Sequence, residues 1–166
     1  MQLDEAKHKF IQHWGSLGSN WGINKTMAQI HALLLVTPEL LSTEDIMEAL
    51  QISRGNANMN LRGLIDWGIV TKEFKVGERR DFFRADKDIW EIGRKIMRER
   101  QKREVEPVLK LLNDLKKMEA QTEEEKEFTK TIADLESFTG SLNGVVDKFV
   151  KSDEHWFYKN LLKVIK

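Results

Sequence analysis

The feature that most constrains this chain is a single change of hydrophobic period in an otherwise helical pattern. Up to about residue 68, apolar residues recur at steps of three and four, which indicates amphipathic helices. The next stretch reads as two short strands, Ile69–Lys75 and Arg80–Ala85, joined by the glycine-bearing turn Val76-Gly77-Glu78-Arg79. From Asp88 onward the helical period returns. The sequence therefore predicts a mainly α fold with one small two-stranded β-hairpin.

Four helices are predicted ahead of the hairpin. Glycines at positions 15, 18 and 22 predict that the first helix frays or bends in its second half. The second, roughly residues 25–36, ends at Thr37-Pro38 because the residue before a proline avoids helical backbone. Ser42-Thr43-Glu44-Asp45 opens a third, short helix, and Ser53 is the predicted N-cap of the fourth. The predicted apolar faces are Leu3, Ala6, Phe10, Trp14, Leu17 and Trp21 in the first helix and Ala57, Leu61 and Leu64 in the fourth, which Gly68 would end.

Long amphipathic helices are predicted after the hairpin. Pro107 kinks or interrupts the first of them, and Thr122-Glu123-Glu124-Glu125 matches a capping box at the start of the next. Ser152-Asp153-Glu154 would open a last helix. The apolar stripe that runs from Phe128 through Phe149 to Ile165 predicts dimerisation, packing within the monomer, or both. We expect an N-terminal helix and winged domain over residues 1–90 and a helical dimerisation region over residues 91–166.

Composition excludes several classes of protein. The 166 residues include no cysteine, which removes disulfides, thiolate metal sites and cysteine nucleophiles. Apart from Glu154 beside His155, no histidine has metal-ligand spacing with nearby acids, and enzyme motifs such as GxSxG and the P-loop are missing. We therefore expect no enzyme, no metal and no cofactor. No apolar run approaches the roughly 18 residues of a membrane span, and Met1–Glu5 lacks a signal-peptide pattern, so we expect a cytoplasmic protein with no membrane partner.

The predicted order of helix, short helix, turn, helix and hairpin is that of a winged helix-turn-helix. The second helix of this motif lies in the major groove of DNA, where its polar face meets base edges and phosphates. Asparagine pairs with adenine and arginine with guanine or phosphate, while glycine allows close approach to the duplex. The residues predicted to face the groove are Arg54, Gly55, Asn56, Asn58, Met59 and Arg62.

The hairpin, or wing, adds a second set of candidate contacts. Its tip presents Lys75, Arg79 and Arg80, and a basic tip suits the negative potential of a narrow minor groove. Thr43 and Ser53 lie at helix starts, where phosphates bind. The wing, residues 72–84, carries five basic and three acidic residues. Residues 1–90 as a whole carry 11 basic and 12 acidic residues, so the net charge of this half does not indicate nucleic-acid binding.

Two blocks of residues resemble the MarR superfamily of regulators and, more narrowly, its GbsR-like branch. They are Ile52-Ser53-Arg54-Gly55-Asn56 through Arg62, followed by Trp67-Gly68-Ile69-Val70, and the wing segment Gly77-Glu78-Arg79-Arg80-Asp81-Phe82-Phe83. The resemblance covers roughly residues 10–115. It implies a homodimeric DNA-binding regulator that reads an inverted repeat with the helix from Ser53 to Trp67, and a minor-groove role for Arg79. It also suggests a choline-like osmoprotectant as small-molecule effector. Two residues depart from the family's pattern. Ala57 is smaller than the residue common at that core position, and Met59 stands where related proteins often have a basic residue.

Alternatives remain open at several positions. Winged helices also serve as protein-interaction modules without DNA activity, and the balanced charge, 27 basic against 27 acidic residues, favours that alternative. The five tryptophans could form an aromatic cage for a quaternary ammonium ligand, although we interpret them as packing residues. The basic run from Arg94 to Arg103 could contact flanking phosphates, although we interpret it as a solvated helix face.

Overall fold

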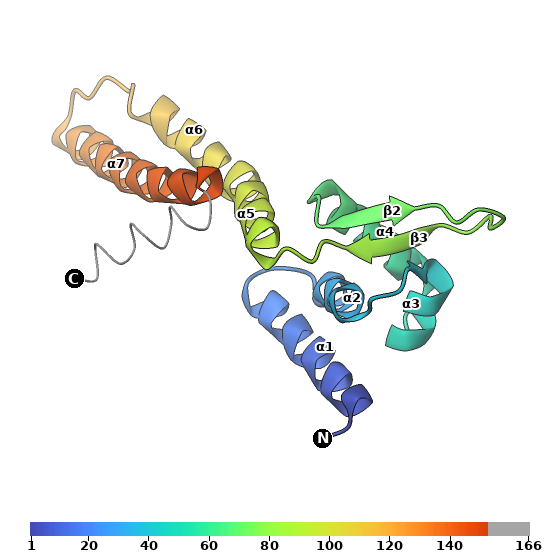
Figure 1. The fold of residues 1–166 in the computed structure, drawn as a ribbon. Coiled ribbons are helices and arrows are strands. Elements are labelled where there is room, and N and C mark those ends of the chain that lie inside the picture. The colour runs from blue at the N-terminus through green and yellow to red at the C-terminus, as the bar shows by residue number, and fades with distance from the viewer. Residues whose placement is uncertain (153–166) are drawn as a thin grey trace. The chain divides into compact units, whose positions relative to one another are not determined.

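The computed structural model describes residues 1–152, which divide into two compact units, the first ending at Ile92 and the second beginning at Gly93. The first unit contains α1 (Leu3–Asn20), α2 (Lys25–Val36), β1 (Leu41–Ser42), α3 (Thr43–Leu50), α4 (Arg54–Asp66), β2 (Val70–Glu73) and β3 (Phe82–Ala85). The helix α5 (Ile89–Arg100) begins in it (Figure 1). The predicted mainly α fold with a hairpin wing is confirmed.

The helices α1 and α2 pack together through the glycines of α1. The predicted fraying at these glycines is wrong, because α1 is continuous to Asn20 and both Gly15 and Gly18 are buried in it. Their missing side chains let the backbone of α1 approach α2, where Gln29 and Ala28 lie against them. The buried face of α1 consists of Ile11, Gly15 and Gly18. The predicted apolar face is therefore offset from the contact, and Leu3, Leu17 and Trp21 are largely exposed.

Helix caps fix the ends of α3 and α4. Ser42 caps α3 in a capping box with Asp45, and Ser53 caps α4 by accepting a hydrogen bond from the amide of Asn56. At the other end of α4, Gly68 has a φ of 71°. The amide of Ile69 donates to the carbonyl of Leu64, which completes a Schellman ending. The predicted caps Ser53 and Gly68 are confirmed.

The sheet has one strand more than predicted. Strands β2 and β3 form the expected antiparallel hairpin; β2 is shorter than predicted at both ends, and β3 begins two residues later but ends at Ala85 as predicted. Leu41–Ser42 pairs with β3 on its other side, in the order β1-β3-β2. A strand of two residues shows no period of its own, so the sequence pattern could not reveal it. Gly77 has a φ of 82°, which explains the glycine in the hairpin turn.

A small apolar core holds the first unit together. It is formed by α2, α3, α4 and the strands, and it includes the predicted stripe of α4. Its most deeply buried large residues are Ile30, Leu34, Ile46, Leu61, Leu64 and Val70, and Ala57 is fully buried among them. The core thereby presents the opposite face of α4 outward.

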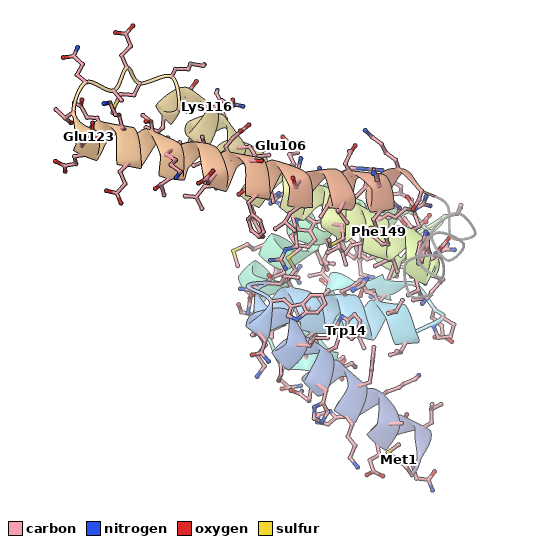
Figure 2. The ribbon with its side chains drawn as sticks, turned by 90° about the vertical axis from the view of Figure 1, so that its left-hand side faces the viewer. Met1, Trp14, Glu106, Lys116, Glu123 and Phe149 are labelled. Atoms are coloured by element: carbon pink, nitrogen blue, oxygen red, sulfur yellow. The ribbon has the colours of Figure 1, made fainter. Side chains whose placement is uncertain are left out.

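The second unit is a helical hairpin. The end of α5 continues through a π-helical turn, Gln101–Val105, into α6 (Glu106–Leu115), which pairs with α7 (Glu123–Lys151). Figure 2 shows the labelled Glu106 and Lys116 of α6 and its C-cap beside the long α7, which runs from Glu123 past Phe149. Pro107 lies in the first turn of α6, directly after the π turn, so the regular α-helix is interrupted ahead of this proline while the chain stays helical.

Some predictions concern residues outside this description. The expected last helix and the end of the 91–166 region extend past residue 152 and so lie outside the described residues. The capping box of Thr122 and Glu125 at the start of α7 is confirmed. Within residues 1–152, no helix is both long and apolar enough to cross a membrane, and no group of three or more His, Asp or Glu side chains could hold a metal ion.

Candidate nucleic-acid interface

The outer face of α4 is polar and open. Because Ala57, Leu61 and Leu64 point into the core, the residues between them point away from it. The exposed members of the predicted contact set are Arg54, Gly55, Asn58, Met59 and Arg62, and Asn56 is half-buried. The helix therefore offers one continuous surface with two guanidinium groups, an amide and a thioether.

Gly55 is not required by the packing of the chain. A Cβ built at this position would meet nothing within 4 Å, and the residue lies in the regular first turn of α4. The missing side chain therefore matters only to something that approaches α4 from outside. Met59, one turn later on the same surface, is 61% exposed, so its thioether is accessible from outside.

Three asparagines lie in a short run of α4, and they have different surroundings. Asn58 is exposed, whereas Asn60 is buried and hydrogen-bonded to Asn56 one turn earlier. Asn56 thus already has an internal partner. Of the two predicted asparagine contacts, Asn58 is the more exposed.

The charges of the wing are largely paired with each other. Three acidic residues lie in the segment from Lys72 to Arg84, and each has a basic partner there. The pairs are Lys72 with Asp81 at 2.9 Å, Arg80 with Glu78 at 3.0 Å, and Arg84 with Glu73 at 3.7 Å. These pairs cancel most of the wing's charge, and two of them, Lys72 with Asp81 and Arg84 with Glu73, join the two sides of the hairpin.

Lys75 and Arg79 account for the remaining positive charge of the wing. Neither forms an ion pair with the residues that the structure describes; the Lys75 ammonium instead lies 4.1 Å from the centroid of the Phe82 ring. Arg79 is exposed in the hairpin turn. Arg80, in contrast, is held by Glu78 and lies over the same Phe82 ring. The tip therefore presents Arg79 as its uncommitted guanidinium.

A hollow lies between α4 and the wing. Its volume is about 240 Å³, and Leu61, Ile65 and Phe83 supply its apolar lining. Polar groups of Asn58, Arg62, Lys72 and Asp81 complete it. Residues of α4 and of the wing therefore line the same hollow, so the two surfaces are adjacent there.

The two residues predicted at helix starts differ in access. Ser53 is exposed and caps α4. Thr43 is only 7% exposed, and the cap of α3 is Ser42 rather than Thr43. A phosphate at α3 would therefore meet backbone amides more readily than the Thr43 hydroxyl.

An ion pair that the sequence did not reveal links α3 to α4. Nη2 of Arg54 donates to Oε1 of Glu44 at 2.6 Å. The hydrogen bond from Arg54 is the main cause that lowers the pKa of the Glu44 carboxyl below its ordinary value. The two residues are ten positions apart, and no local spacing rule predicts such a contact.

Comparisons with known proteins establish the fold and no family. No family model and no curated protein matches the chain. A solved structure described as a transcriptional regulator has a TM-score of 0.66 and 20% identity, and the match covers 87% of this chain and 95% of that chain. Structures of MepR from S. aureus, one bound to an oligodeoxyribonucleotide and one a DNA complex, have TM-scores of 0.42 and 0.39 at 18% and 20% identity. Each covers 84% of this chain and 94% of that chain.

Proposed function

We propose that this chain is a DNA-binding transcriptional regulator of the MarR type, in its GbsR-like branch, and not an enzyme. The observation that carries the proposal is the continuous surface of α4 and the wing, on which Arg54, Asn58, Arg62 and Arg79 project outward. A winged helix uses this surface to bind a duplex. The TM-score of 0.66 to a structure described as a transcriptional regulator agrees with the fold on which the proposal rests.

In the proposed complex, α4 enters the major groove and the wing reaches the minor groove. Arg54 and Arg62 would donate to guanine or phosphate, Asn58 to adenine, and Met59 would contact a thymine methyl group or sugar. Gly55 would let the backbone of α4 approach the duplex. Lys75 and Arg79 would neutralise phosphates beside the minor groove.

Selection of duplexes from a random-sequence library with the full-length protein tests this proposal. The expected result is an enriched inverted repeat whose half-sites are about one helical turn apart, as for other dimeric helix-turn-helix proteins. Affinity for the enriched duplex should fall steeply with salt, because phosphate contacts release counterions. A library that shows no enrichment at low salt would contradict the proposal.

We further propose that the protein is a homodimer formed through its helical region. On α7, apolar side chains that are 43–66% exposed recur at steps of seven, three, four and three: Phe128, Leu135, Phe138, Leu142 and Val145. This spacing is typical of a helix that packs against a second helix. Sedimentation at micromolar concentration should give twice the chain mass of 19.4 kDa. A species of 19.4 kDa would contradict the dimer.

The proposed effector is a small quaternary ammonium osmoprotectant, and the proposed location is the cytoplasm. This effector is proposed from the resemblance to the GbsR-like branch, and the five tryptophans of the chain serve as fluorescent reporters of its binding. Titration with choline or betaine should change the tryptophan fluorescence in a saturable way. A flat titration with both compounds would remove this effector from the proposal and leave DNA binding untouched.

The second candidate function is a protein-interaction module without DNA activity. It is favoured by the zero net charge and by the three ion pairs that cancel most of the wing's charge. Such a module would show weak duplex binding with no sequence preference. The selection experiment separates the two functions, because only a regulator enriches a shared sequence.

A further inference from the structure

The starts of α3 and α4 lie close together, and one carboxylate links them. Glu44 is in the first turn of α3, and Arg54 is the first residue of α4. The carboxylate of the neighbouring Asp45 is already occupied, because it accepts from the amide and the hydroxyl of Ser42 at 2.7 Å each. Glu44 is therefore the acid of this turn that is left to bind Arg54.

The start of α4 lacks an acid of its own. The first turn of most helices favours acidic residues, because the helix dipole is positive there, and α4 has none in that turn. Arg54 adds a further positive charge at this end. Glu44 supplies the missing negative charge from α3, and the positive charge of Arg80 on the wing also acts on the same carboxyl. Glu44 thus lies near Arg54 and Arg80, two of the basic side chains predicted to contact the duplex.

The geometry of the contact leaves most of the guanidinium available. The hydrogen bond between the two side chains joins Nη2 of Arg54 to a single carboxylate oxygen of Glu44. The remaining N–H donors of Arg54 can still form the paired contact with guanine. Both side chains are well exposed, at 60% and 42%, so the pair contributes little to folding stability.

We propose that Glu44 is a specificity-determining residue, which holds Arg54 for guanine and disfavours its binding to phosphate. This inference rests on the proposed DNA-binding function. A guanidinium fixed by a carboxylate meets a base edge in one orientation, whereas a free guanidinium follows any nearby phosphate. The negative charge of Glu44 also repels the phosphates of the DNA backbone, which weakens binding to duplexes of every sequence. Glu44 therefore lowers the affinity for all duplexes and raises the preference for guanine at one position.

Parallel selections from one random-duplex library test the proposal, with the wild type, Glu44→Gln, Arg54→Ala and Glu48→Gln. Glu48 lies on α3, is exposed, and has no ion pair with residues 1–152, so Glu48→Gln makes the same charge change away from Arg54. We expect one guanine position per half-site to lose about tenfold in preference in both Glu44→Gln and Arg54→Ala, within the range of a paired arginine–guanine contact. Glu44→Gln should also bind a scrambled duplex more tightly than the wild type does. Glu48→Gln should keep the wild-type preference.

The outcomes separate the two proposals. If the wild type enriches a sequence and Glu44→Gln keeps every base preference of the wild type, the role of Glu44 is overturned and the regulator stands. The same holds if Glu44→Gln and Glu48→Gln change affinity and preference equally. If the wild type enriches nothing, the DNA-binding function fails, and the role of Glu44 fails with it.

Discussion

Asn60 donates from Nδ2 to both the carbonyl oxygen and the side-chain Oδ1 of Asn56, at 2.8 and 2.7 Å. Asn60 is 4% exposed, so water cannot reach its side-chain amide. The two bonds to Asn56 supply the hydrogen-bond partners that a buried amide needs. One asparagine of the run thus stabilises α4 and also orients a second. The third, Asn58, is left for the surface.

The first prediction separates Asn58 from Asn60 by substitution. Asn60→Ala should lower the free energy of unfolding by about 1 kcal/mol, because it removes internal hydrogen bonds. Asn58→Ala should leave stability within about 0.5 kcal/mol of the wild type but weaken one base preference. Urea unfolding and duplex binding of both variants check this. Equal loss of base preference in a fully stable Asn60→Ala would show that the assignment is reversed.

The second prediction compares two adjacent arginines of the wing. Arg79→Ala should weaken binding to all duplex sequences by several-fold and reduce the salt slope by about one, as expected for a phosphate contact. Arg80→Ala should have a smaller effect, because Glu78 already holds this side chain at 3.0 Å. Affinities measured over a range of salt concentrations give both slopes. Identical losses for the two variants would mean that the Arg80–Glu78 pair opens on binding.

The elements of the first unit could be predicted from local patterns. Ser53 and Gly68 mark the ends of α4 through hydroxyl capping and positive φ, which depend on nearby residues alone. The hairpin has a strand period and a glycine turn. These signals place the helix and the wing that form the candidate site before any tertiary contact is known.

The contacts that could not be predicted join residues distant in sequence. Glu44 meets Arg54 across two helices, and Leu41–Ser42 pairs with β3 some forty residues later. Helix propensity predicts fraying at Gly18, whereas the role of this glycine comes from the close approach of α2. In each case, packing between elements outweighs the local preference.

The third prediction tests the glycine face of α1. A Cβ at position 18 would lie 2.6 Å from the Cβ of Ala28, which belongs to a rigid, buried residue. Gly18→Ala should therefore destabilise the protein by about 1–3 kcal/mol in spite of alanine's helix propensity. At position 15 the Cβ would lie 2.5 Å from Cγ of Gln29, a side chain that can move only by giving up its hydrogen bond to Gln12, so Gly15→Ala should also destabilise the protein, but less than Gly18→Ala. Thermal unfolding should rank the two variants in this order, and the reverse order would contradict the packing.

The fourth prediction concerns the buried His31 of α2. Burial, aided by the charge of Lys87, lowers the pKa of His31 from 6.5 to about 4. The unfolded chain therefore binds more protons than the folded chain between these two pH values. The stability that neutral His31 contributes is complete above about pH 6.5 and is lost as the pH falls toward 4. At pH 4.5 the loss should be roughly 2–3 kcal/mol, at about 1.4 kcal/mol per pKa unit.

Substitution isolates this contribution from that of the carboxylates. Hydrogen bonds lower the pKa values of Glu44, Asp45 and Glu125, so these groups also cost stability as the pH falls, in every variant alike. His31→Met removes the titrating group, and the exposed His13→Gln serves as the matched control. Urea unfolding at pH 7.5 and 4.5 should show a smaller loss for His31→Met than for the wild type and His13→Gln. Equal losses in all three proteins would mean that folded His31 takes up a proton as readily as it does in the unfolded chain, so that burial does not lower its pKa.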